Sequence, residues 1–516
     1  MKKETFSVVE HDAASSGAAS AAEGSPGYLL KPMRPLLAVL AVVYLALTLC
    51  GFDGSLMLSI YTQPDYVATF RPANDGGATS VLVVFLIFNI AQMVLGLCCP
   101  LADVLGRRKM MRWGGVGTVV GGVITAAATN TATIIAGRFV LAFFTVWLLT
   151  AAAIYVTEIA PTDKRLVVAG AYNTLWYVGL VVAAFAAYGA NRHFGGTATA
   201  FRLPLALQCM YPGLLVVGTF FIPELPRWLV GRGRVDEARA IIVKYHGGND
   251  AEAPVVAAEM AAIDALFAAA AIATGWRALD LRPLFGRRHR YRTMLCMLLG
   301  WFGQFSGNNV CSYYLPLMLN AVGIESQLTQ VLMNGVYSIT LWGAAVVGSY
   351  CHGVIGRRKM FLALTLAALV AMAALAAALA RFQATAAVAA STATLVFIYV
   401  FGVVFLFAWT PMQPIYPAEV LLNVLRSRSF IAQQLVAGLA LFVNQYAAPI
   451  AMERISFWFY VFYSLWDVVE CVIIYLLFVE TKGKSLEEMD AIFAAANPRK
   501  ASVAVWPPPH HKRTHI

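Results

Sequence analysis

Long apolar runs alternate with short polar intervals along almost the whole chain. A membrane-spanning helix needs about 20 mostly apolar residues, and runs of that kind occur six times before residue 223 and six times after residue 292. They lie near residues 36–60, 80–101, 113–129, 133–156, 167–190, 203–222, 293–320, 328–352, 359–380, 390–412, 427–450 and 456–478. The pattern predicts an all-α polytopic membrane protein with twelve transmembrane helices in two six-helix bundles.

The same pattern divides the chain into five parts. Residues 36–222 and 293–479 are the two predicted bundles. Residues 223–292 join them, and apolar residues recur there at helical spacing without the length to span, which predicts surface helices. The polar segments 1–35 and 480–516 are predicted to be tails, the first of them disordered. The first apolar run is too long for a signal peptide and lacks a cleavage site, so we expect it to remain in the mature protein.

The placement of charge predicts the orientation. The chain has 38 Lys and Arg against 27 Asp and Glu, and the basic residues gather in the tails, in 223–292 and in alternate loops. In membrane proteins the cytoplasmic loops carry the excess of Lys and Arg. Both termini and the 223–292 interval are therefore predicted to be cytoplasmic. This distribution indicates membrane lipid as the surroundings and no nucleic-acid partner.

Two short echoes indicate an internal duplication. LGRRKMM at 105–111 recurs as IGRRKMF at 355–361, each after the second run of its half. TEIAPTDKR at 157–165 is echoed by AEVLLNVLR at 418–426, each after the fourth run. Two related bundles with a pseudo-two-fold axis along the membrane normal are typical of transporters that rock one bundle against the other.

Several motifs occur together in a specific order. They are ADVLGRR (102–108), GRF (137–139), YVTEIAPTDKR (155–165), PELPRWL (223–229), GQFSGNN (303–309), GRR (356–358), YPAE (416–419) and VETKGKSLEEMD (479–490). With this order and spacing, the chain from about 36 to 493 resembles the sugar porter family of the major facilitator superfamily. It looks closest to fungal lactose-permease-like and hexose-transporter-like members.

The resemblance implies transport of a sugar by alternating access. We expect the protein at the plasma membrane, with a monomer as the default. No nucleotide-binding loop, metal-ligand cluster or nucleophile motif is present in the sequence. We therefore expect no enzyme activity, no cofactor and no metal.

Charged residues at the predicted cytoplasmic helix ends form one candidate constellation. In the resembling family such residues make salt-bridge clusters that close the inside of the outward-open state. The matching positions are Asp103, Arg107, Arg108, Glu158, Arg165, Glu224, Arg227, Arg357, Arg358, Glu419, Arg426 and Glu480. Gly353 and Val354 replace the usual acid and base of the second half, so we expect Glu419 to supply the acid there. The alternative is that these charges only set the topology.

A sugar-binding site needs amides that both donate and accept hydrogen bonds, together with aromatic platforms. The seventh run supplies such residues around Gly303 and Gly307, and interior glycines favour a discontinuous helix that lines a cavity. The substrate-site candidates are Asn173, Gln304, Asn308, Asn309, Tyr313, Tyr314, Trp409, Asn444 and Gln445. The alternatives are that the amides join neighbouring helices by hydrogen bonds and that Trp409 packs in the core.

Comparison with the family pattern shows three lost contacts. Gly303 replaces the first Gln of the usual pair, Pro414 stands where many members have a platform Trp, and Leu341 replaces a common Asn. Asn173 also stands where most members have the longer Gln. These differences predict a reshaped pocket.

One carboxylate interrupts the first run, in LTLCGFDGSLML at 47–58. A charge at this depth is costly unless it is paired, protonated or turned to a cavity. Arg138 in the fourth run is the natural partner of Asp53. In the resembling family an Asp that faces this Arg marks proton-coupled members, so Asp53 and Arg138 are predicted to couple proton movement to transport. The alternative is a static pair that fixes helix packing.

The leading hypothesis is proton-coupled symport of a hexose or disaccharide. The partners are then a sugar and protons. A passive sugar uniporter is one alternative, and a transporter-like membrane sugar sensor is another of a different class.

Overall fold

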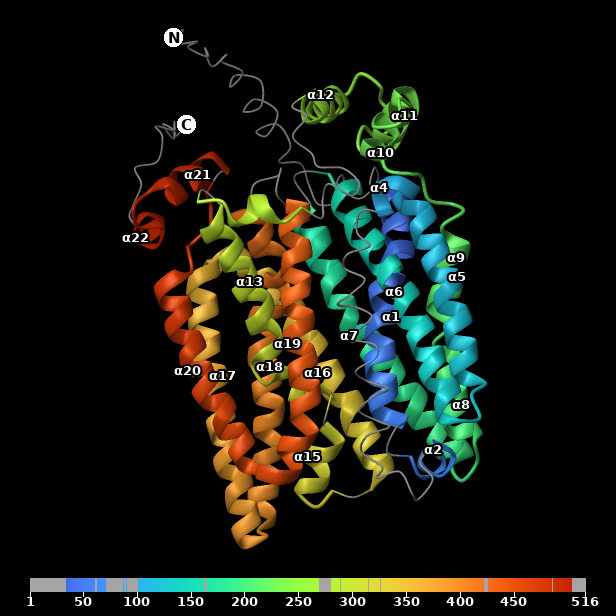
Figure 1. Ribbon diagram of the computed structural model, residues 1–516, viewed down its shortest axis with the longest axis vertical. Coiled ribbons are helices and arrows are strands. Elements are labelled where there is room, and N and C mark those ends of the chain that lie inside the picture. Colours follow the sequence, from blue (N-terminus) through green and yellow to red (C-terminus); the bar gives the residue numbers. More distant parts are fainter. Residues whose placement is uncertain are drawn as a thin grey trace, which may run out of the picture.

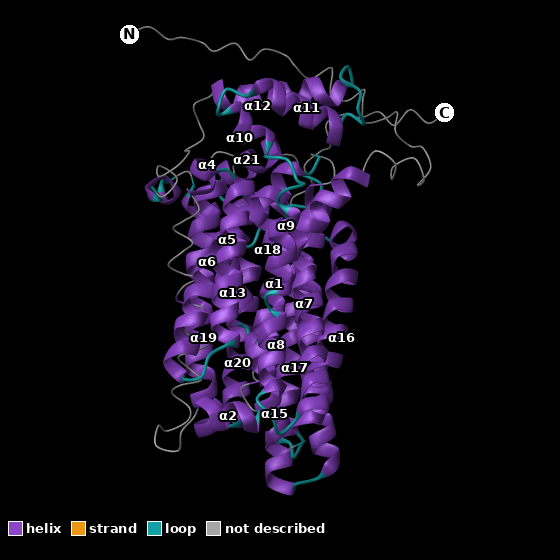
Figure 2. Cartoon of the chain, turned by 90° about the vertical axis from the view of Figure 1, so that its right-hand side faces the viewer, coloured by secondary structure: helices purple, strands orange, loops and turns teal. Residues whose placement is uncertain are grey.

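The computed structural model describes residues 34–60, 63–70, 87, 90, 101–161, 165–268, 280–287, 289–313, 315–324, 326–421, 426–484 and 486–503. All regular elements in this part are helices, and most of them run along the long axis of the molecule (Figure 2). Nine of the described helices are long and apolar enough to cross a membrane. The all-α polytopic fold expected from the sequence is therefore confirmed.

The first half follows the predicted runs. Its elements are α1 (Arg34–Ile60), α2 (Pro64–Phe70), α4 (Leu101–Leu105), α5 (Arg107–Ala126), α6 (Thr131–Ile159), α7 (Arg165–Phe194), α8 (Thr199–Leu207) and α9 (Met210–Gly218). The sixth run begins earlier than predicted and is divided between α8 and α9, with Pro204 inside α8. Most of the second predicted run, 80–101, lies outside the described residues.

Short helices occupy the interval between the halves and the segment after the last span. They are α10 (Pro226–Val230), α11 (Val235–Tyr245), α12 (Pro254–Ala268) and the 3-10 helix η3 (Arg282–Phe285), followed at the C-terminal end by α21 (Leu486–Ala494) and α22 (Pro498–Val503). Figure 1 shows α10–α12 and α21–α22 at the same end of the molecule. We call this the linker end.

The second half begins with a broken helix. The seventh run forms α13 (Arg290–Phe305), α14 (Asn308–Tyr313) and α15 (Leu315–Ala321). It is followed by α16 (Gln327–Ile355), α17 (Arg357–Thr385), α18 (Val388–Val420), α19 (Arg426–Ile455) and α20 (Phe457–Leu477). Three prolines, Pro411, Pro414 and Pro417, lie inside α18 without ending it.

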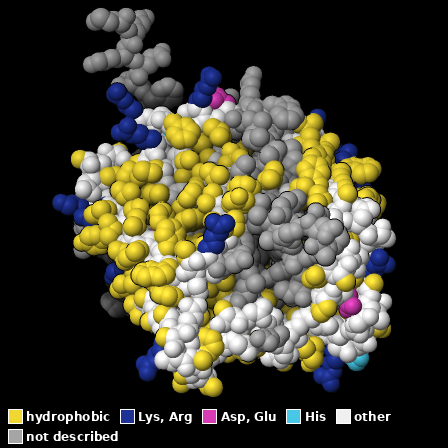
Figure 3. All heavy atoms as spheres, turned by 60° about the horizontal axis from the view of Figure 1, so that its bottom comes forward, with side chains coloured by type: hydrophobic (Ala, Val, Ile, Leu, Met, Phe, Trp, Pro, Cys, Tyr) yellow, Lys and Arg dark blue, Asp and Glu magenta, His cyan; other side chains and the backbone are white. Residues whose placement is uncertain are grey.

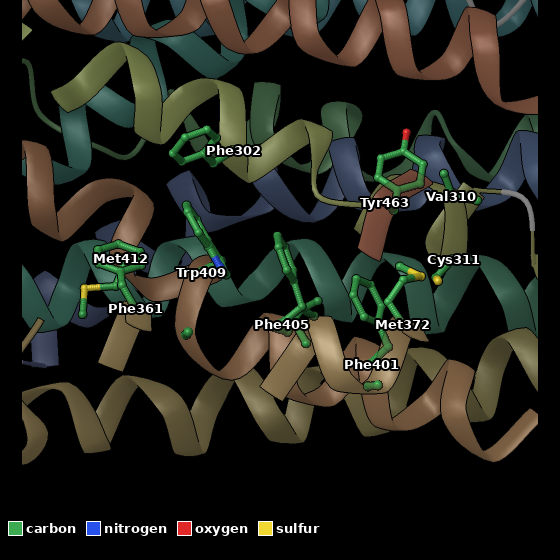
Figure 4. Close-up of a cluster of buried hydrophobic side chains, with 14 of the residues drawn as sticks. Phe302, Val310, Cys311, Phe361, Met372, Phe401, Phe405, Trp409, Met412 and Tyr463 are labelled. Atoms are coloured by element: carbon green, nitrogen blue, oxygen red, sulfur yellow. The ribbon is translucent and has the colours of Figure 1, made fainter. Parts of the chain in front are cut away.

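Each half has its own hydrophobic core. One large cluster draws its buried side chains from Leu36 to Tyr245, and another draws them mainly from Leu295 to Ile492. Figure 4 shows part of the second cluster, where the aromatic rings of Phe302, Phe405 and Trp409 gather. Helix α7 joins the two halves, since it packs against α1 on one side and against α16 and α18 on the other.

The outer surface is strongly apolar. Phe221, Leu465 and Trp458 are 81%, 64% and 61% exposed, and Figure 3 shows a broad hydrophobic face with few charged side chains. Exposed apolar surface on this scale is unfavourable in water, whereas a bilayer accommodates it. The outer face therefore fits an integral, multi-pass membrane protein.

Candidate functional site

Two side-chain clusters at the linker end have the same construction. In the first half the Glu224 carboxylate accepts hydrogen bonds from the backbone N–H groups of Arg107 and Arg108, at 3.1 and 3.2 Å. These groups begin α5 and have no acceptor within the helix, so the carboxylate caps it. Burial raises the pKa of Glu224, although the N–H donors and the nearby guanidinium groups oppose the shift.

In the second half Glu480 caps α17 in the same way. Its carboxylate accepts from the N–H groups of Arg357 and Arg358, at 2.9 and 3.2 Å. Gly106 and Gly356 precede the two capped helices with φ of 87° and 90°. A Cβ at either glycine would lie 2.7 or 3.0 Å from an oxygen of the capping glutamate. The repeated GRR sequence thus encodes a repeated cap.

Arginine side chains complete both clusters. Arg107 Nη2 lies 2.8 Å from Asp103 Oδ1 and 3.5 Å from Glu158 Oε1. Arg357 binds both carboxylate oxygens of Glu419, at 3.1 and 2.6 Å. The structure thus places Glu419 beside Arg357, in the half whose loop lacks an acid.

Two tyrosines that the sequence analysis did not single out also take part in these clusters. Tyr155 and Tyr416 each stand three residues before the cluster glutamate of their half. The Tyr155 hydroxyl donates to the Pro223 carbonyl at 2.8 Å, and the Tyr416 hydroxyl donates to the Val479 carbonyl at 3.2 Å. Both carbonyls belong to the residue before a capping glutamate. Their shared spacing in YVTE and YPAE was the available signal.

The remaining predicted gate residues lie at the same end. Arg227 is on α10, where Trp228 Nε1 donates to the Asp103 carbonyl at 2.9 Å. Arg165 and Arg426 are the first residues of α7 and α19, but their side chains lie outside the described part of the structure. The ion pairs recorded in the two clusters each join residues of one half.

The seventh helix breaks at Ser306 and Gly307. Gly307 has φ of 80°, which a residue with a side chain rarely adopts. Across the break, Asn309 Nδ2 donates to the backbone carbonyl and side-chain Oε1 of Gln304, at 2.7 and 3.0 Å. Asn444 Nδ2 from α19 donates to the same carbonyl at 2.9 Å. The break therefore brings three predicted amides together.

Some polar atoms at this break have no hydrogen-bond partner. The buried oxygens Asn308 Oδ1 and Asn444 Oδ1 accept no hydrogen bond from the described part of the chain. Buried amide oxygens usually have a partner, because an unpaired one costs about 1–3 kcal/mol. The site therefore offers acceptors that a polyhydroxylated ligand could use.

Gln413 is a site residue that the sequence analysis missed. A Cβ at Gly303 would lie 2.7 Å from Gln413 Nε2, so this α18 amide occupies the space beside the glycine. The first Gln of the usual pair is lost at Gly303, and the Gln413 amide reaches that position from the neighbouring helix. Gln413 is visible in TPMQPIYPAE, but only the packing of α18 on α13 shows where its side chain lies.

Among the described residues, polar contacts cross between the halves at two places. Asn173 Nδ2 on α7 donates to the Thr410 carbonyl on α18 at 2.6 Å. The hydroxyls of Tyr177 and Thr410 lie 3.0 Å apart. Nearer the other end, Asn334 Nδ2 on α16 donates to Ser55 Oγ on α1 at 3.2 Å. Asn334, buried at 2% exposure, is another residue that the sequence analysis missed.

The remaining substrate-site candidates differ in their surroundings. Trp409 has no exposed surface, and its ring stacks on Phe405 at 5.7 Å and lies 4.9 Å from Phe361 (Figure 4). This position favours core packing over sugar stacking. Gln445 is buried on α19. Tyr314 and the Tyr313 side chain lie outside the described residues.

A cavity of about 550 Å³ lies on the linker side of this break. Its lining comes from α13, η3 and α19: Phe285, Arg290, Tyr291, Met294, Met297, Leu298, Trp301 and Val436. These side chains are mostly apolar, so the cavity itself has few hydrogen-bonding groups. The predicted amides are not among them.

Asp53 and Arg138 form an ion pair between α1 and α6. Arg138 Nη1 donates to Asp53 Oδ1, and the two residues are only 2% and 1% exposed. The second carboxylate oxygen, Asp53 Oδ2, is buried and accepts no hydrogen bond within the described residues. The structure thus brings together the two residues that the sequence analysis paired.

The helix that carries Asp53 is tightly bound to α7. A Cβ at Gly51 would lie 1.8 Å from the Trp176 carbonyl oxygen, and one at Gly179 would lie 2.1 Å from the Thr48 carbonyl oxygen. The α1 and α7 backbones therefore touch between Thr48 and Phe52, directly before Asp53. A shift of α1 at Asp53 would move α7, which carries the contacts with Thr410.

Comparisons with known proteins agree with this arrangement. The sequence profile of the family described as sugar (and other) transporter matches residues 39–493. The MFS-type transporter criB of Aspergillus cristatus is 25% identical over 450 residues, which is 86% of this chain and 90% of that protein. Sugar transport protein MST2 of Oryza sativa subsp. japonica is 26% identical over 400 residues, 75% of this chain and 74% of its own.

Solved structures share the fold. The proton:xylose symporter XylE bound to 6-bromo-6-deoxy-D-glucose superimposes with a TM-score of 0.74 at 18% identity, covering 89% of this chain and 98% of that one. The inward-open xylose transporter XylE from E. coli gives a TM-score of 0.71 at 19% identity, covering 88% and 99%. The chain belongs to the sugar (and other) transporter family of the major facilitator superfamily and is a membrane transporter.

Proposed function

We propose that the protein is a proton-coupled symporter of a hexose or disaccharide, placed in the plasma membrane with both termini and the linker helices on the cytoplasmic side. The two halves, 36–222 and 293–479, would rock about a central site and open it to each side in turn. The observation that carries the proposal is the buried Asp53–Arg138 pair on a helix that is locked to α7.

The chemistry of the pair supports coupling. A buried carboxylate stays charged beside an arginine and becomes easier to protonate when that partner or its hydration changes. Protonation would leave Arg138 without its counter-ion and change the contact between α1 and α6. Because α1 and α7 move together, this change reaches the Asn173 and Tyr177 contacts with the second half. Proton binding and bundle movement would then be linked.

The broken seventh helix supports a sugar as the substrate. Gln304, Asn309 and Asn444 converge there, and unpaired amide oxygens lie beside them. Amides both donate and accept, as neighbouring hydroxyls of one sugar ring require. The plant relatives named as sugar transport proteins agree with this choice.

We propose that the two capped clusters at the linker end are the cytoplasmic gate. Their carboxylates and arginines lie at helix ends that come together when the molecule closes on that side. Arg165, Arg227 and Arg426 would add contacts between the halves in that state. A role in setting topology alone would not require matched caps and matched tyrosine hydrogen bonds.

Uptake by vesicles with an imposed inward proton gradient tests the proposal. Wild-type protein should concentrate the sugar, whereas Asp53→Asn should lose gradient-driven accumulation and keep counterflow exchange, which moves no net charge or proton. Asp65→Asn is the matched control, because Asp65 is on the short helix α2 and accepts from Gly196 N at 3.1 Å away from the buried pair.

Each other outcome selects another function. Equal, gradient-independent uptake by wild type and Asp53→Asn would indicate a passive uniporter and a static ion pair. Sugar binding without any flux in wild type would indicate a sensor. Labelled glucose, galactose, lactose, cellobiose and xylose, supplied in turn to a host without sugar transporters, identify the substrate.

A further inference from the structure

Two more carboxylates lie inside the membrane region, on the last spanning helix. Asp467 and Glu470 of α20 are 1% and 0% exposed, although α20 is on the outside of the second half. Residues three positions apart on a helix are neighbours on one face. Acidic side chains at this depth are rare because an ionised carboxylate is costly there, and they commonly mark functional sites.

Glu470 has hydrogen-bond donors and Asp467 has none. The Ser306 hydroxyl lies 2.8 Å from both Glu470 oxygens, and Trp466 Nε1 donates to Glu470 Oε1 at 2.6 Å. Both oxygens of Asp467 are buried and without a partner within the described residues. Trp466 Nε1 stabilises an anion on Glu470, and the single proton of the Ser306 hydroxyl is shared between Glu470 and the Phe302 carbonyl. Asp467 has no donor in the described part of the chain, so it is the member that needs a proton.

The described stretches of the seventh helix, α17 and α19 around this pair bring no cation. Residues 360–380 of α17 contain no ionisable side chain, and residues 429–452 of α19 contain only Tyr446. From residues 294–312 of the seventh helix the ionisable groups are Cys296 and Cys311, and Cys311 interacts electrostatically with Asp467. The nearby groups on α20 itself are Tyr460, Tyr463 and Cys471. These stretches contain no arginine that could form an ion pair with Asp467, as Arg138 does with Asp53.

We propose that Asp467 and Glu470 form a second proton-binding site, which holds at least one proton and lies at the break of the seventh helix. The proton enters from water and binds a carboxylate oxygen of Asp467, so that the two neighbouring acids are not charged together. A metal ion fits less well, since the Trp466 N–H points at Glu470 and the described residues contain no group of three potential metal ligands.

The position of the site links the proton to movement of the seventh helix. Ser306, whose hydroxyl proton is shared between Glu470 and the Phe302 carbonyl, is the first residue of the break, and Gly307 packs against Met372 and Tyr463. If the break straightens or rotates, the Ser306 hydroxyl leaves Glu470 and the anion loses a donor. Proton affinity then rises, and by reciprocity protonation favours that movement. This deepens the proposed transport mechanism and rests on it only in treating the seventh helix as a moving part.

Infrared difference spectroscopy of the purified full chain in lipid nanodiscs tests the proposal without sugar or flux. The Asp53→Asn background removes the first proton site. We expect this protein to keep a protonated-carboxyl band at neutral pH, and Asp467→Asn in the same background to abolish it. Ser306→Ala should move the pH at which this carboxyl band disappears upward by about one unit, since the Glu470 carboxylate loses a hydrogen-bond donor. Ser464→Ala is the control, because that hydroxyl bonds to the Tyr460 carbonyl of its own helix.

Three results would overturn the proposal. The first is a band that neither Asp467→Asn nor Glu470→Gln changes; thermal unfolding of both variants checks that they are folded. The second is a neutral-pH spectrum without such a band. The third is a sodium-dependent change of the band at constant pH, which would indicate an alkali-cation site. Because no transport is measured, failure here leaves the gradient test of Asp53→Asn untouched, and failure of that test leaves this one valid.

Discussion

Asn309 holds Gln304 in place, while Gln304 also accepts from Asn444 through its backbone. We therefore expect Gln304→Ala and Asn309→Ala to raise the half-saturating sugar concentration several-fold, since each removes one or two hydrogen bonds of about 1 kcal/mol. Initial uptake rates over a range of sugar concentrations measure this. Gln383→Ala, at an exposed amide that reaches Ser456, is the control. Unchanged kinetics in both site variants would move the substrate site elsewhere.

Substitutions at Gln413 and Gly303 should affect sugar affinity through the same side chain, the Gln413 amide. Gln413→Ala should weaken sugar affinity several-fold by removing the amide that replaces the lost Gln, again at about 1 kcal/mol per hydrogen bond. Gly303→Ala should have a similar effect, because its methyl group would displace Gln413 Nε2. Substitutions that act through one side chain are not additive. The double variant should therefore bind no worse than either single one, and additive losses of affinity would contradict the shared role.

At the scale of single elements, the two caps explain why GRR occurs twice. Gly356 combines φ of 90° with a close approach to Glu480. Gly356→Ala should therefore cost about 1–3 kcal/mol of stability, the usual cost of such a backbone conformation for a residue with a side chain. The thermal unfolding midpoint of the solubilised protein should fall accordingly.

Gly343 provides the control for this substitution. It lies within α16, and a Cβ there would meet nothing within 4 Å. Gly343→Ala should leave the midpoint unchanged or raise it, because alanine favours the helix. Equal midpoints for Gly356→Ala and Gly343→Ala would show that the cap does not depend on the glycine.

At the scale of the whole molecule, contacts at opposite ends should shift the conformational balance in opposite directions. Glu419 holds Arg357 at the linker end. We expect Glu419→Gln to favour states open on that side, because the population of each state follows the contacts unique to it. A cysteine introduced beside the Gln304–Asn309–Asn444 amide cluster should then react faster with a reagent applied from the linker side. Unchanged reactivity would contradict a gating role.

Asn334 lies two turns into α16 and joins it to α1. The preceding helix α15 lies at the end of the molecule opposite the linker end (Figure 1). Asn334→Ala removes a contact between the halves and should favour opening on that opposite side. The same cysteine should react faster with a reagent applied there, and net transport should fall. Ser338→Ala is the control, since the Ser338 hydroxyl bonds only to the Asn334 carbonyl of its own helix among the recorded contacts. Equal rates of cysteine labelling in Asn334→Ala and Ser338→Ala would contradict the prediction.

The sequence predicted most of the fold and part of the candidate site. The lengths of the apolar runs predicted α1, α6, α7 and α16–α20. In a bilayer every backbone polar group must find its hydrogen-bond partner inside its own helix, so such runs form helices. The same rule made the Asp53 carboxylate conspicuous and limited its partner to Arg138. The glycines beside the seventh-run amides likewise predicted a break, which the structure has at Gly307.

Other features depended on contacts between distant segments. In three contacts the partners are more than a hundred residues apart along the chain, and no local pattern encodes such distances. They are the contacts of Gln413 with Gly303, of Asn334 with Ser55 and of Ser306 with Glu470. Trp409 was an aromatic candidate for which the sequence left core packing and sugar stacking both open, and the rings of Phe361 and Phe405 lie against it.

The sequence by itself determined the membrane class, most of the helices and the two GRR helix starts, because lipid permits only one backbone structure for such runs and the positive φ of Gly106 and Gly356 favours glycine. Only the tertiary structure decided which polar side chains share a site. A polar group inside the membrane must find a partner wherever the packing of helices provides one, and that packing is a property of all the helices together.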